Sequence, residues 1–350
     1  MKAYRLHDFT GLDDLKLREE DTPHPQQGEV LVRVHAVSLN FRDIAMLRGR
    51  YPVPHRKGLI PTSDGAGEVV EVGAGVDDFK VADRVMGIFH PRWYGGRMPP
   101  NVSRFGYGSE IDGWLVERKV LSQESLVRVP DGLSYEEASA LPCAALTAWS
   151  ALTLGTAIRS GHTVLTQGTG GVSIFALQLA KATGASVIST TSGAAKADRL
   201  RELGADEVVN YRDEPRWGDR VRTLTGGRGV DRVVEVGGPG TIGESLRAVR
   251  PGGEIACIGF LNAKGPGIDF FAFFASGATF RHISVGSREG LQDVARTIAT
   301  ASIKPVIDRV FDFEDAKDAF AHLESGSHFG KVVIRCSSST QTSSTAIFPS

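Results

Sequence analysis

The stretch VLTQGTGGVSIFALQLAK, residues 164–181, decides the fold of this protein. An apolar, strand-like run leads through glycines directly into a helical pattern. Gly168, Gly170 and Gly171 allow a tight turn and a close approach to a pyrophosphate, and the helix start offers free N–H groups. Ser173 stands where the dinucleotide-binding pattern normally has a third glycine, and we expect its hydroxyl to bond within the first helical turn. We interpret the stretch as a phosphate-binding loop inside a βαβ unit.

Short apolar strands alternate with helical stretches from about residue 160 onward. This alternation is typical of a parallel sheet with helices on both faces. The first third of the chain instead has period-two apolar runs between glycine turns, which indicates a mostly β, barrel-like unit. We therefore predict an α/β protein with one domain at 1–125, completed by 280–336, a second domain at 126–279, and a mobile tail at 337–350.

The end of the next strand indicates which dinucleotide the loop binds. An acidic residue about 20 positions after the glycines normally holds the ribose hydroxyls of NAD. This chain has Thr191 and Ser192 there, followed by Lys196. Hydroxyls and a cation suit a 2′-phosphate, so we predict NADP(H) rather than NAD(H). The alternative for Lys196 is an ordinary solvated helix residue.

Composition narrows the classes of function. The formal net charge is −1, so the chain has no field that favours a nucleic acid or an acidic membrane surface. No apolar run is long enough for a signal peptide or a membrane span. Three scattered cysteines are too few for a disulfide framework or a four-cysteine zinc knot. We expect a cytoplasmic protein in a reducing compartment, with no nucleic-acid or membrane partner.

A series of motifs covers nearly the whole chain: AVSLNFRD (36–43), IPTSDGAGEVVEVG (60–73), LPCAALTAW (141–149), QGTGGVSIFALQLAK (167–181) and HFGKVVI (328–334). In this order they resemble the medium-chain dehydrogenase/reductase superfamily, and specifically its zinc-independent branch near the quinone oxidoreductases. The resemblance implies a GroES-like β-barrel catalytic domain and a Rossmann domain with a doubly wound parallel sheet. It also implies a nicotinamide bound between the two domains and a homodimer.

The same resemblance implies further cofactor contacts. Several of them lie at the carboxyl ends of strands, where open α/β sheets bind ligands. These implied contacts are Thr147, Val172, Tyr211, Gly237, Gly238, Phe260, Gly330 and Lys331.

Zinc-containing relatives hold a catalytic metal with a cysteine, a histidine and a second cysteine. The resemblance places Asn40, Ser63 and Cys143 at these positions. One thiol and two neutral oxygen groups do not supply the three ligands that zinc requires, so we predict no metal. Asp64 is the alternative ligand, and we interpret Cys143 as a packed side chain rather than a nucleophile.

Without a metal to polarise a carbonyl, hydride addition is easiest where the product anion is delocalised. We therefore predict hydride transfer to an activated alkene or a quinone, an electron-poor small molecule. The candidate catalytic residues are Asn40 and Tyr51, whose amide and phenol can donate to a developing enolate oxygen. Asn40 is alternatively a loop-capping residue and Tyr51 a plain boundary tyrosine, and we interpret Arg42 with Asp43 as a structural ion pair.

Two other functions stay open. One is an alcohol dehydrogenase or carbonyl reductase in which Asn40, Tyr51 and ordered water replace the metal, and the other is an NADPH-binding protein with little turnover. Two segments also keep two interpretations each. Segment 90–114 either shapes the acceptor pocket or packs as a surface loop, and the phenylalanines of 268–277 either line a pocket or lie in a core or dimer interface.

Overall fold

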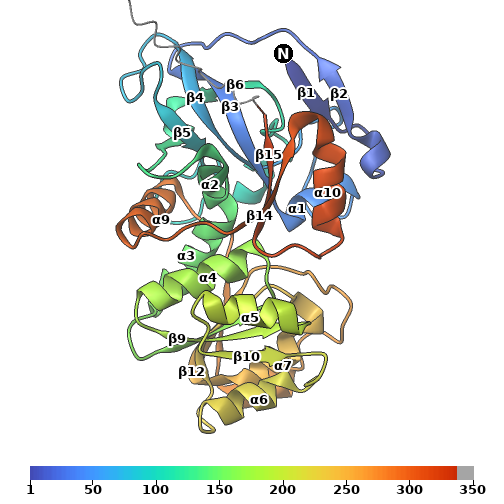
Figure 1. The fold of residues 1–350 in the computed structure, drawn as a ribbon, viewed down its shortest axis with the longest axis vertical. Coiled ribbons are helices and arrows are strands. Elements are labelled where there is room, and N and C mark those ends of the chain that lie inside the picture. Colours follow the sequence, from blue (N-terminus) through green and yellow to red (C-terminus); the bar gives the residue numbers. More distant parts are fainter. Residues whose placement is uncertain (337–350) are drawn as a thin grey trace, which may run out of the picture.

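Two large β-sheets organise the protein, each in its own domain (Figure 1). In the computed structural model, which describes residues 1–336, the first sheet is mostly antiparallel and the second is wholly parallel. The predicted fold class is confirmed. The tail predicted at 337–350 lies outside the described residues.

The first domain contains a seven-stranded sheet in the order β14-β15-β3-β4-β5-β7, with β6 also paired to β3. Because β15 runs antiparallel to β3 with Val332 opposite Leu39, the C-terminal segment returns to the first domain and brings Lys331 beside Asn40. The strands are β3 (Glu29–Leu39), β4 (Asp64–Val72), β5 (Arg84–Gly87), β6 (Arg118–Ser122), β7 (Leu126–Arg128), β14 (Ile307–Asp312) and β15 (Lys331–Arg335), beside the separate pair β1 (Lys2–Arg5) and β2 (Lys16–Glu19).

The second domain contains six parallel strands in the order β10-β9-β8-β11-β12-β13. Strand order runs outward in both directions from β8 and β11, so the topological switch point lies between them, directly beyond the glycine loop. The strands are β8 (Thr163–Gln167), β9 (Ser186–Thr191), β10 (Glu207–Asn210), β11 (Val230–Glu235), β12 (Val249–Cys257) and β13 (Thr279–His282), so the chain leaves this sheet after residue 282.

Helices cover both faces of the parallel sheet. In Figure 1, α4 and α5 lie on the face turned toward the first domain, whereas α6 and α7 lie on the opposite face and pack against each other. The helices are α1 (Phe41–Leu47), α2 (Tyr135–Ser139), α3 (Leu146–Thr153), α4 (Gly171–Ala182), α5 (Ala194–Glu202), α6 (Trp217–Leu224), α7 (Ile242–Ala248), α8 (Phe270–Ser276), α9 (Arg288–Thr300) and α10 (Ala316–Glu324).

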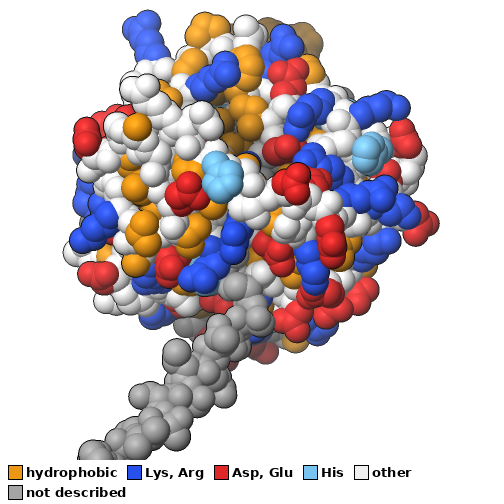
Figure 2. All heavy atoms as spheres, turned by 90° about the horizontal axis from the view of Figure 1, so that it is seen from above, with side chains coloured by type: hydrophobic (Ala, Val, Ile, Leu, Met, Phe, Trp, Pro, Cys, Tyr) orange, Lys and Arg blue, Asp and Glu red, His pale blue; other side chains and the backbone are white. Residues whose placement is uncertain are grey.

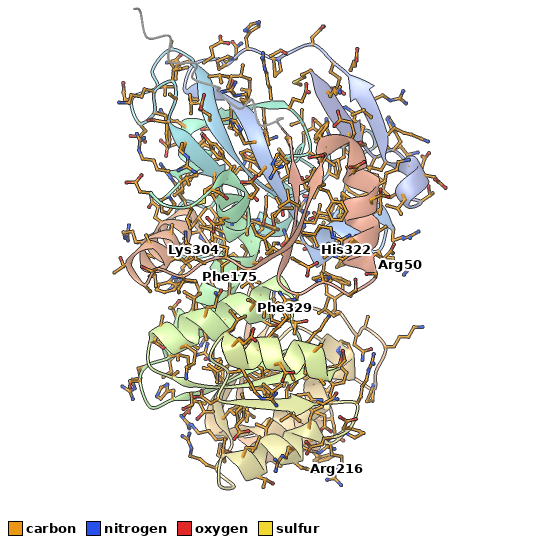
Figure 3. All side chains as sticks on the ribbon, in the orientation of Figure 1. Arg50, Phe175, Arg216, Lys304, His322 and Phe329 are labelled. Atoms are coloured by element: carbon orange, nitrogen blue, oxygen red, sulfur yellow. The ribbon has the colours of Figure 1, made fainter. Side chains whose placement is uncertain are left out.

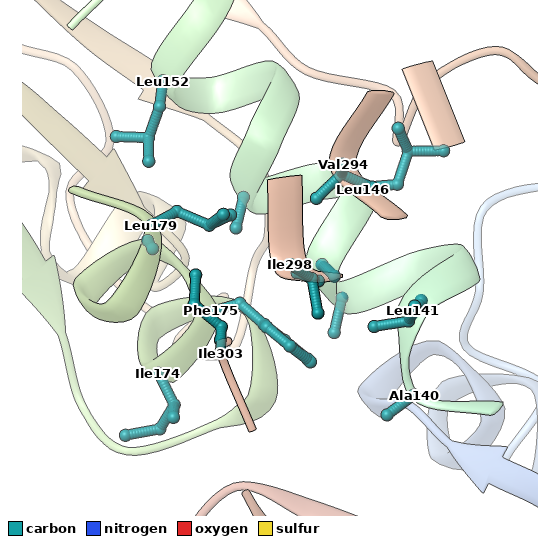
Figure 4. Close-up of a cluster of buried hydrophobic side chains, with 14 of the residues drawn as sticks. Ala140, Leu141, Leu146, Leu152, Ile174, Phe175, Leu179, Val294, Ile298 and Ile303 are labelled. Atoms are coloured by element: carbon teal, nitrogen blue, oxygen red, sulfur yellow. The ribbon is translucent and has the colours of Figure 1, made fainter. Parts of the chain in front are cut away.

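A cluster of buried apolar side chains joins α3, α4 and α9 at the junction of the domains (Figure 4). Leu146, Phe175, Val294 and Ile298 are almost fully buried in it. Figure 3 shows Phe175 and Phe329 in the middle of the molecule, between the two sheets. Burial of one such side chain contributes about 1.5–3 kcal/mol, so this packing fixes the start of α4 against the first domain.

Within the part of the chain that is described, no helix is long and apolar enough to cross a membrane. The face shown in Figure 2 mixes Lys and Arg side chains with Asp and Glu side chains. That face therefore has no extended patch of one charge.

Candidate functional site

The glycine loop follows β8 and leads into α4, as the sequence predicted. Gly168 has φ of +70°, a conformation that favours glycine. A Cβ atom built on Gly168 or Gly170 would meet no atom within 4 Å, so the space beside the loop is open. The first N–H groups of α4, including that of Val172, have no partner within the helix. This combination fits a dinucleotide pyrophosphate.

Ser173 answers the question that the missing glycine raises. Its side chain is buried, and its hydroxyl donates to the backbone oxygen of Gln167 over 2.6 Å. The expectation that this hydroxyl bonds within the first helical turn was wrong, because it reaches back to the end of β8. The serine thus ties helix to strand at the place where a glycine would only let them approach.

The end of β9 contains an unsatisfied buried hydroxyl. Thr191 is 1% exposed, and its Oγ1 has no hydrogen-bond partner among the described residues. Tyr211 lies beside it, since its backbone N–H donates to the Thr191 oxygen over 3.0 Å, and Ser192 is half-buried. Lys196 donates to the carbonyl oxygens of Gly326 (3.1 Å) and His328 (3.0 Å). It is therefore anchored to the C-terminal segment, with one further donor left for a ligand.

A buried carboxylate that sequence reasoning missed shapes the end of β11. Glu235 accepts the backbone N–H groups of Gly237 (2.8 Å) and Gly238 (2.9 Å), and it accepts Gln167 Nε2 over 2.8 Å. These bonds hold the two glycines beside the end of β8. The sequence does show a glutamate shortly before two glycines at the end of a strand, which indicates that the glutamate binds their N–H groups. Its partner Gln167 is 68 residues away and could not be identified from this stretch.

The implied contacts of the first domain converge on Lys331. Lys331 is 3% exposed, and its Nζ donates to the Leu39 oxygen over 2.7 Å and to Asn40 Oδ1 over 2.6 Å. Gly330 donates to the Thr169 oxygen over 2.9 Å and forms a bridge with Gly170. The HFGK motif therefore connects the glycine loop directly to Asn40. Thr147, also implied as a contact, is buried in α3.

Asp64 forms the other half of this cluster. It is fully buried and accepts Asn40 Nδ2 over 3.0 Å, Ser63 Oγ over 2.7 Å and the backbone N–H of Cys143 over 3.1 Å. Burial raises the pKa of Asp64, and the nearby Lys331 ammonium opposes that rise. Cys143 lies in a five-residue π-helix, Leu141–Ala145, a geometry often found at functional sites.

The residues at the metal-ligand positions do not fit a metal ion. Asn40 and Ser63 supply neutral groups that are already bonded within the cluster, which leaves the Cys143 thiol as the one soft ligand at these three positions. In residues 1–336, no three His, Cys, Asp or Glu side chains are grouped to hold a metal. Zinc needs deprotonated donors, and this set contains an ammonium instead.

Asn40 also caps the start of α1, which is the alternative role that we considered for it. Its backbone N–H donates to Asp43 Oδ2 over 2.8 Å. Its amide is engaged on both ends, by Lys331 and by Asp64 with Ser63. In this arrangement the orientation of the Asn40 amide is fixed by its neighbours in the cluster.

Tyr51 and Phe260 bring the two domains together. Their ring centroids are 6.2 Å apart, and Phe41, which is 42% exposed, lies 6.0 Å from Phe260. The Arg42 guanidinium lies 5.1 Å from the Tyr51 ring centroid, 3.4 Å from Asp43 and 2.8 Å from the Tyr107 oxygen. Arg42 with Asp43 is therefore the structural ion pair that we expected, and Arg42 also orients Tyr51.

Two segments with open interpretations take different forms. In segment 90–114, Trp93, Tyr107 and Trp114 are buried, and Trp114 packs against two glycines of the first-domain sheet, so aromatic packing dominates. In 268–277, Phe270 and Phe271 are 67% and 80% exposed on α8. Phe273 of the same helix instead packs partly buried against the core beside Phe280, so the core interpretation holds for Phe273 and is wrong for the exposed phenylalanines.

Comparisons with known proteins agree with this geometry. Residues 26–131 match the alcohol dehydrogenase GroES-like domain and residues 171–300 match the zinc-binding dehydrogenase family. A zinc-type alcohol dehydrogenase-like protein of Schizosaccharomyces pombe is 37% identical, over 95% of this chain and 98% of its own.

Two solved structures share the whole architecture. One, a Sinorhizobium meliloti 1021 protein described as an alcohol dehydrogenase, is 40% identical with a TM-score of 0.88, covering 95% of this chain and 98% of its own. The other, Escherichia coli quinone oxidoreductase complexed with NADPH, is 26% identical with a TM-score of 0.82, covering 96% and 100%. This chain therefore belongs to the medium-chain dehydrogenase/reductase superfamily of oxidoreductases.

Proposed function

We propose that this protein is a zinc-independent, NADP(H)-dependent oxidoreductase that transfers a hydride to an activated alkene or a quinone. The observation that carries the proposal is the donor set around Asn40, Ser63 and Cys143, in which two of the three positions hold neutral groups and the Lys331 ammonium bonds Asn40. Without a Lewis acid, an acceptor whose product anion is delocalised is the easier substrate.

NADP(H) is the proposed cofactor because the end of β9 presents hydroxyls and a cation without a carboxylate. Thr191 Oγ1 is buried without a partner, and Lys196 keeps one donor free. Both suit a 2′-phosphate. The quinone oxidoreductase with the same fold was solved with NADPH, which agrees with this assignment.

A nicotinamide cofactor would supply the hydride, and the chain supplies position and polarity. The glycine loop and the first turn of α4 would hold its pyrophosphate, while Asp64 and Lys331 fix the Asn40 amide between them. The rings of Tyr51 and Phe260, tilted by 33° to each other, provide an apolar wall against which a planar acceptor would pack. Tyr51 donates its phenolic proton to the developing enolate or quinol oxygen.

An alcohol dehydrogenase or carbonyl reductase is the second candidate. The names of the yeast relative and of the Sinorhizobium protein favour it. In that function Tyr51 would protonate an alkoxide, which is a stronger base than an enolate and gains more from a metal ion.

The deciding experiment measures oxidation of NADPH by absorbance with quinones, enones, aldehydes and ketones, with and without a chelator, and again with NADH. We expect chelator-insensitive turnover of enones or quinones with NADPH. Tyr51→Phe should lower kcat by about 100-fold, the usual range for a proton donor, whereas the exposed Tyr94→Phe should not. Turnover confined to aldehydes or ketones would establish the second candidate, and cofactor binding without any turnover would leave an NADPH-binding protein.

We also propose a homodimer formed through α8 and β13. Phe270, Phe271 and Phe274 project from α8 with 67–80% exposure, and β13 is the end strand of the parallel sheet. An exposed apolar patch beside an unpaired strand edge fits a second copy of the chain. Light scattering should give a dimer for the native chain and a monomer for Phe271→Glu combined with Phe274→Glu. A dimer that survives both substitutions would exclude this surface.

A further inference from the structure

The side chain of Lys331 reaches Asn40, one of the three positions that hold zinc in metal-containing relatives. Its Nζ bonds Asn40 Oδ1 over 2.6 Å, and Asn40 in turn bonds Ser63 Oγ over 3.4 Å and Asp64 Oδ2 over 3.0 Å. Asp64 then bonds the backbone N–H of Cys143. All three metal-ligand positions are thus linked to one buried cation and one buried carboxylate.

We propose that Lys331 replaces the metal ion as the fixed positive charge of the site, excludes a divalent metal from it, and acts on the reaction by positioning Asn40. The inference deepens the zinc-independent reaction proposed above and rests on it only for the part that concerns activity. The exclusion of metal is a property of the folded chain alone.

The surrounding charges assign Lys331 to Asp64. Asp43, the other buried carboxylate nearby, already has Arg42 at 3.4 Å. Among the described residues, Asp64 accepts three neutral donors and no direct bond from a cation, and the Lys331 ammonium is linked to it through the Asn40 amide. Lys331 is therefore the cation that faces Asp64 across this amide, and a divalent metal placed between them would meet its repulsion.

Lys331 is held at this point by the glycine loop. A Cβ on Gly171 would lie 2.5 Å from Lys331 Cδ, so the lysine side chain runs directly across the first residue of α4. Gly330 is bonded to Thr169, which fixes where the side chain starts. The lysine side chain thus runs from the phosphate-binding loop to Asn40, where its ammonium donates to the Leu39 oxygen and to Asn40 Oδ1. Because Oδ1 faces Lys331, the amide nitrogen of Asn40 faces Asp64.

Metal binding tests the exclusion directly. Asn40→Cys adds a thiol to the thiol of Cys143 and the carboxylate of Asp64, which gives three ligands of the kind that zinc sites use. We would titrate Co²⁺ alone and follow the cobalt–thiolate absorption bands. We compare two variants: Asn40→Cys alone, and Asn40→Cys combined with Lys331→Met. The single variant, which keeps Lys331, should bind Co²⁺ at least about 100-fold more weakly than the combination. This factor is the upper range for the effect of residues that surround a metal site.

Matched variants complete this test. Lys196→Met removes another lysine bonded to two carbonyl oxygens, and in the Asn40→Cys background it should leave Co²⁺ binding unchanged. Equal Co²⁺ affinity with and without Lys331, or no binding by the folded Lys331→Met combination, would overturn the exclusion. This result does not depend on which acceptor the enzyme reduces, so it stands apart from the outcome of the substrate assay.

A double-mutant cycle in the native background tests the positioning role. Lys331→Met and Asn40→Ala should each lower kcat, and the double variant should be no slower than the slower single variant, because both act through one amide. Dissociation of NADPH should change less than kcat. Additive losses would show that Lys331 does not act through Asn40, and this cycle decides the matter if a cobalt-binding variant fails to fold.

Discussion

The glycine loop after β8 and the lysine cluster around Asn40 touch at the Gly170–Gly330 bridge, yet they are built in opposite ways. The loop consists of six consecutive residues, uses backbone N–H groups, and faces open space. The cluster draws its side chains from four separated segments and buries two opposite charges. A site made by backbone conformation can be read from a contiguous stretch, whereas a site made by buried charges exists only after the sheets have formed.

This difference predicts where substitutions act. At Gly168 and Gly170, where the loop faces open space, they should change the binding of the cofactor with little loss of stability. In the cluster they should change stability and turnover together.

The largest effect is expected from Lys331→Met. The substitution keeps the side-chain volume but leaves the Asp64 carboxylate buried without a cation, and it leaves Asn40 Oδ1 and the Leu39 oxygen without a donor. Breaking a direct buried charge pair costs about 3–5 kcal/mol, and because Lys331 and Asp64 are linked through the Asn40 amide, we expect a loss near the lower end of this range. Urea unfolding followed by circular dichroism would measure the difference in the free energy of unfolding.

Lys331→Met combined with Asp64→Asn is the matched control. It removes the unpaired charge, so most of the lost free energy of unfolding should return. If the combination is as unstable as Lys331→Met, the loss comes from packing and not from the buried carboxylate.

Sequence reasoning predicted the loop but only part of the cluster, because only the loop is contiguous in the sequence. Strand, glycines and helix are adjacent in sequence, so their spacing alone indicated a phosphate loop. The antiparallel register of β15 on β3, which brings Lys331 to Asn40 across 291 positions, is set by the sheet and cannot be read from either segment. The motif resemblance named Lys331 as a cofactor contact, but nothing local indicated its bond to Asn40.

Acid should destabilise the first domain through His90. Burial lowers the pKa of His90 to about 3, with the Arg42 cation adding to the shift, while the unfolded chain titrates near the ordinary value of about 6.5. Between these two values the unfolded chain binds a proton at this histidine and the folded chain does not. The free energy of unfolding that is present above pH 6.5 is therefore lost as the pH falls. From pH 6.5 to 4 this amounts to about 3 kcal/mol.

His90→Gln should flatten the pH dependence of unfolding by that amount over this window. The control is His24→Gln, because the His24 side chain is 77% exposed in the same domain and its removal should leave the curve unchanged. If the free energy of unfolding depends on pH in the same way in the native protein and in His90→Gln, His90 binds its proton in the folded protein as readily as in the unfolded chain.

Substitution of two neighbouring glycines, Gly170 and Gly171, distinguishes an effect on cofactor binding from an effect on stability. Gly171→Ala places a Cβ against Lys331 and should cost about 1–3 kcal/mol of stability through overpacking. Gly170→Ala enters open space with φ of −75°, an ordinary backbone conformation, so stability should hold while NADPH affinity falls. Thermal unfolding and fluorescence titration of NADPH would measure both, and a larger stability loss at Gly170 would contradict the assignment of Lys331 to the space beside Gly171.

The smallest expected effect concerns Ser173, which replaces the third glycine of the loop pattern. Ser173→Ala removes the bond to the Gln167 oxygen and should cost about 1 kcal/mol, the usual net value of one hydrogen bond. Ser173→Gly restores the common pattern but loses the same bond and adds about 0.5 kcal/mol of helix penalty relative to serine, so it should cost about 1.5 kcal/mol. Because the hydroxyl points to β8 and away from the open space, NADPH affinity should stay the same in both variants. A gain of stability in Ser173→Gly would mean that close approach of helix and strand, rather than the hydroxyl bond, limits this junction.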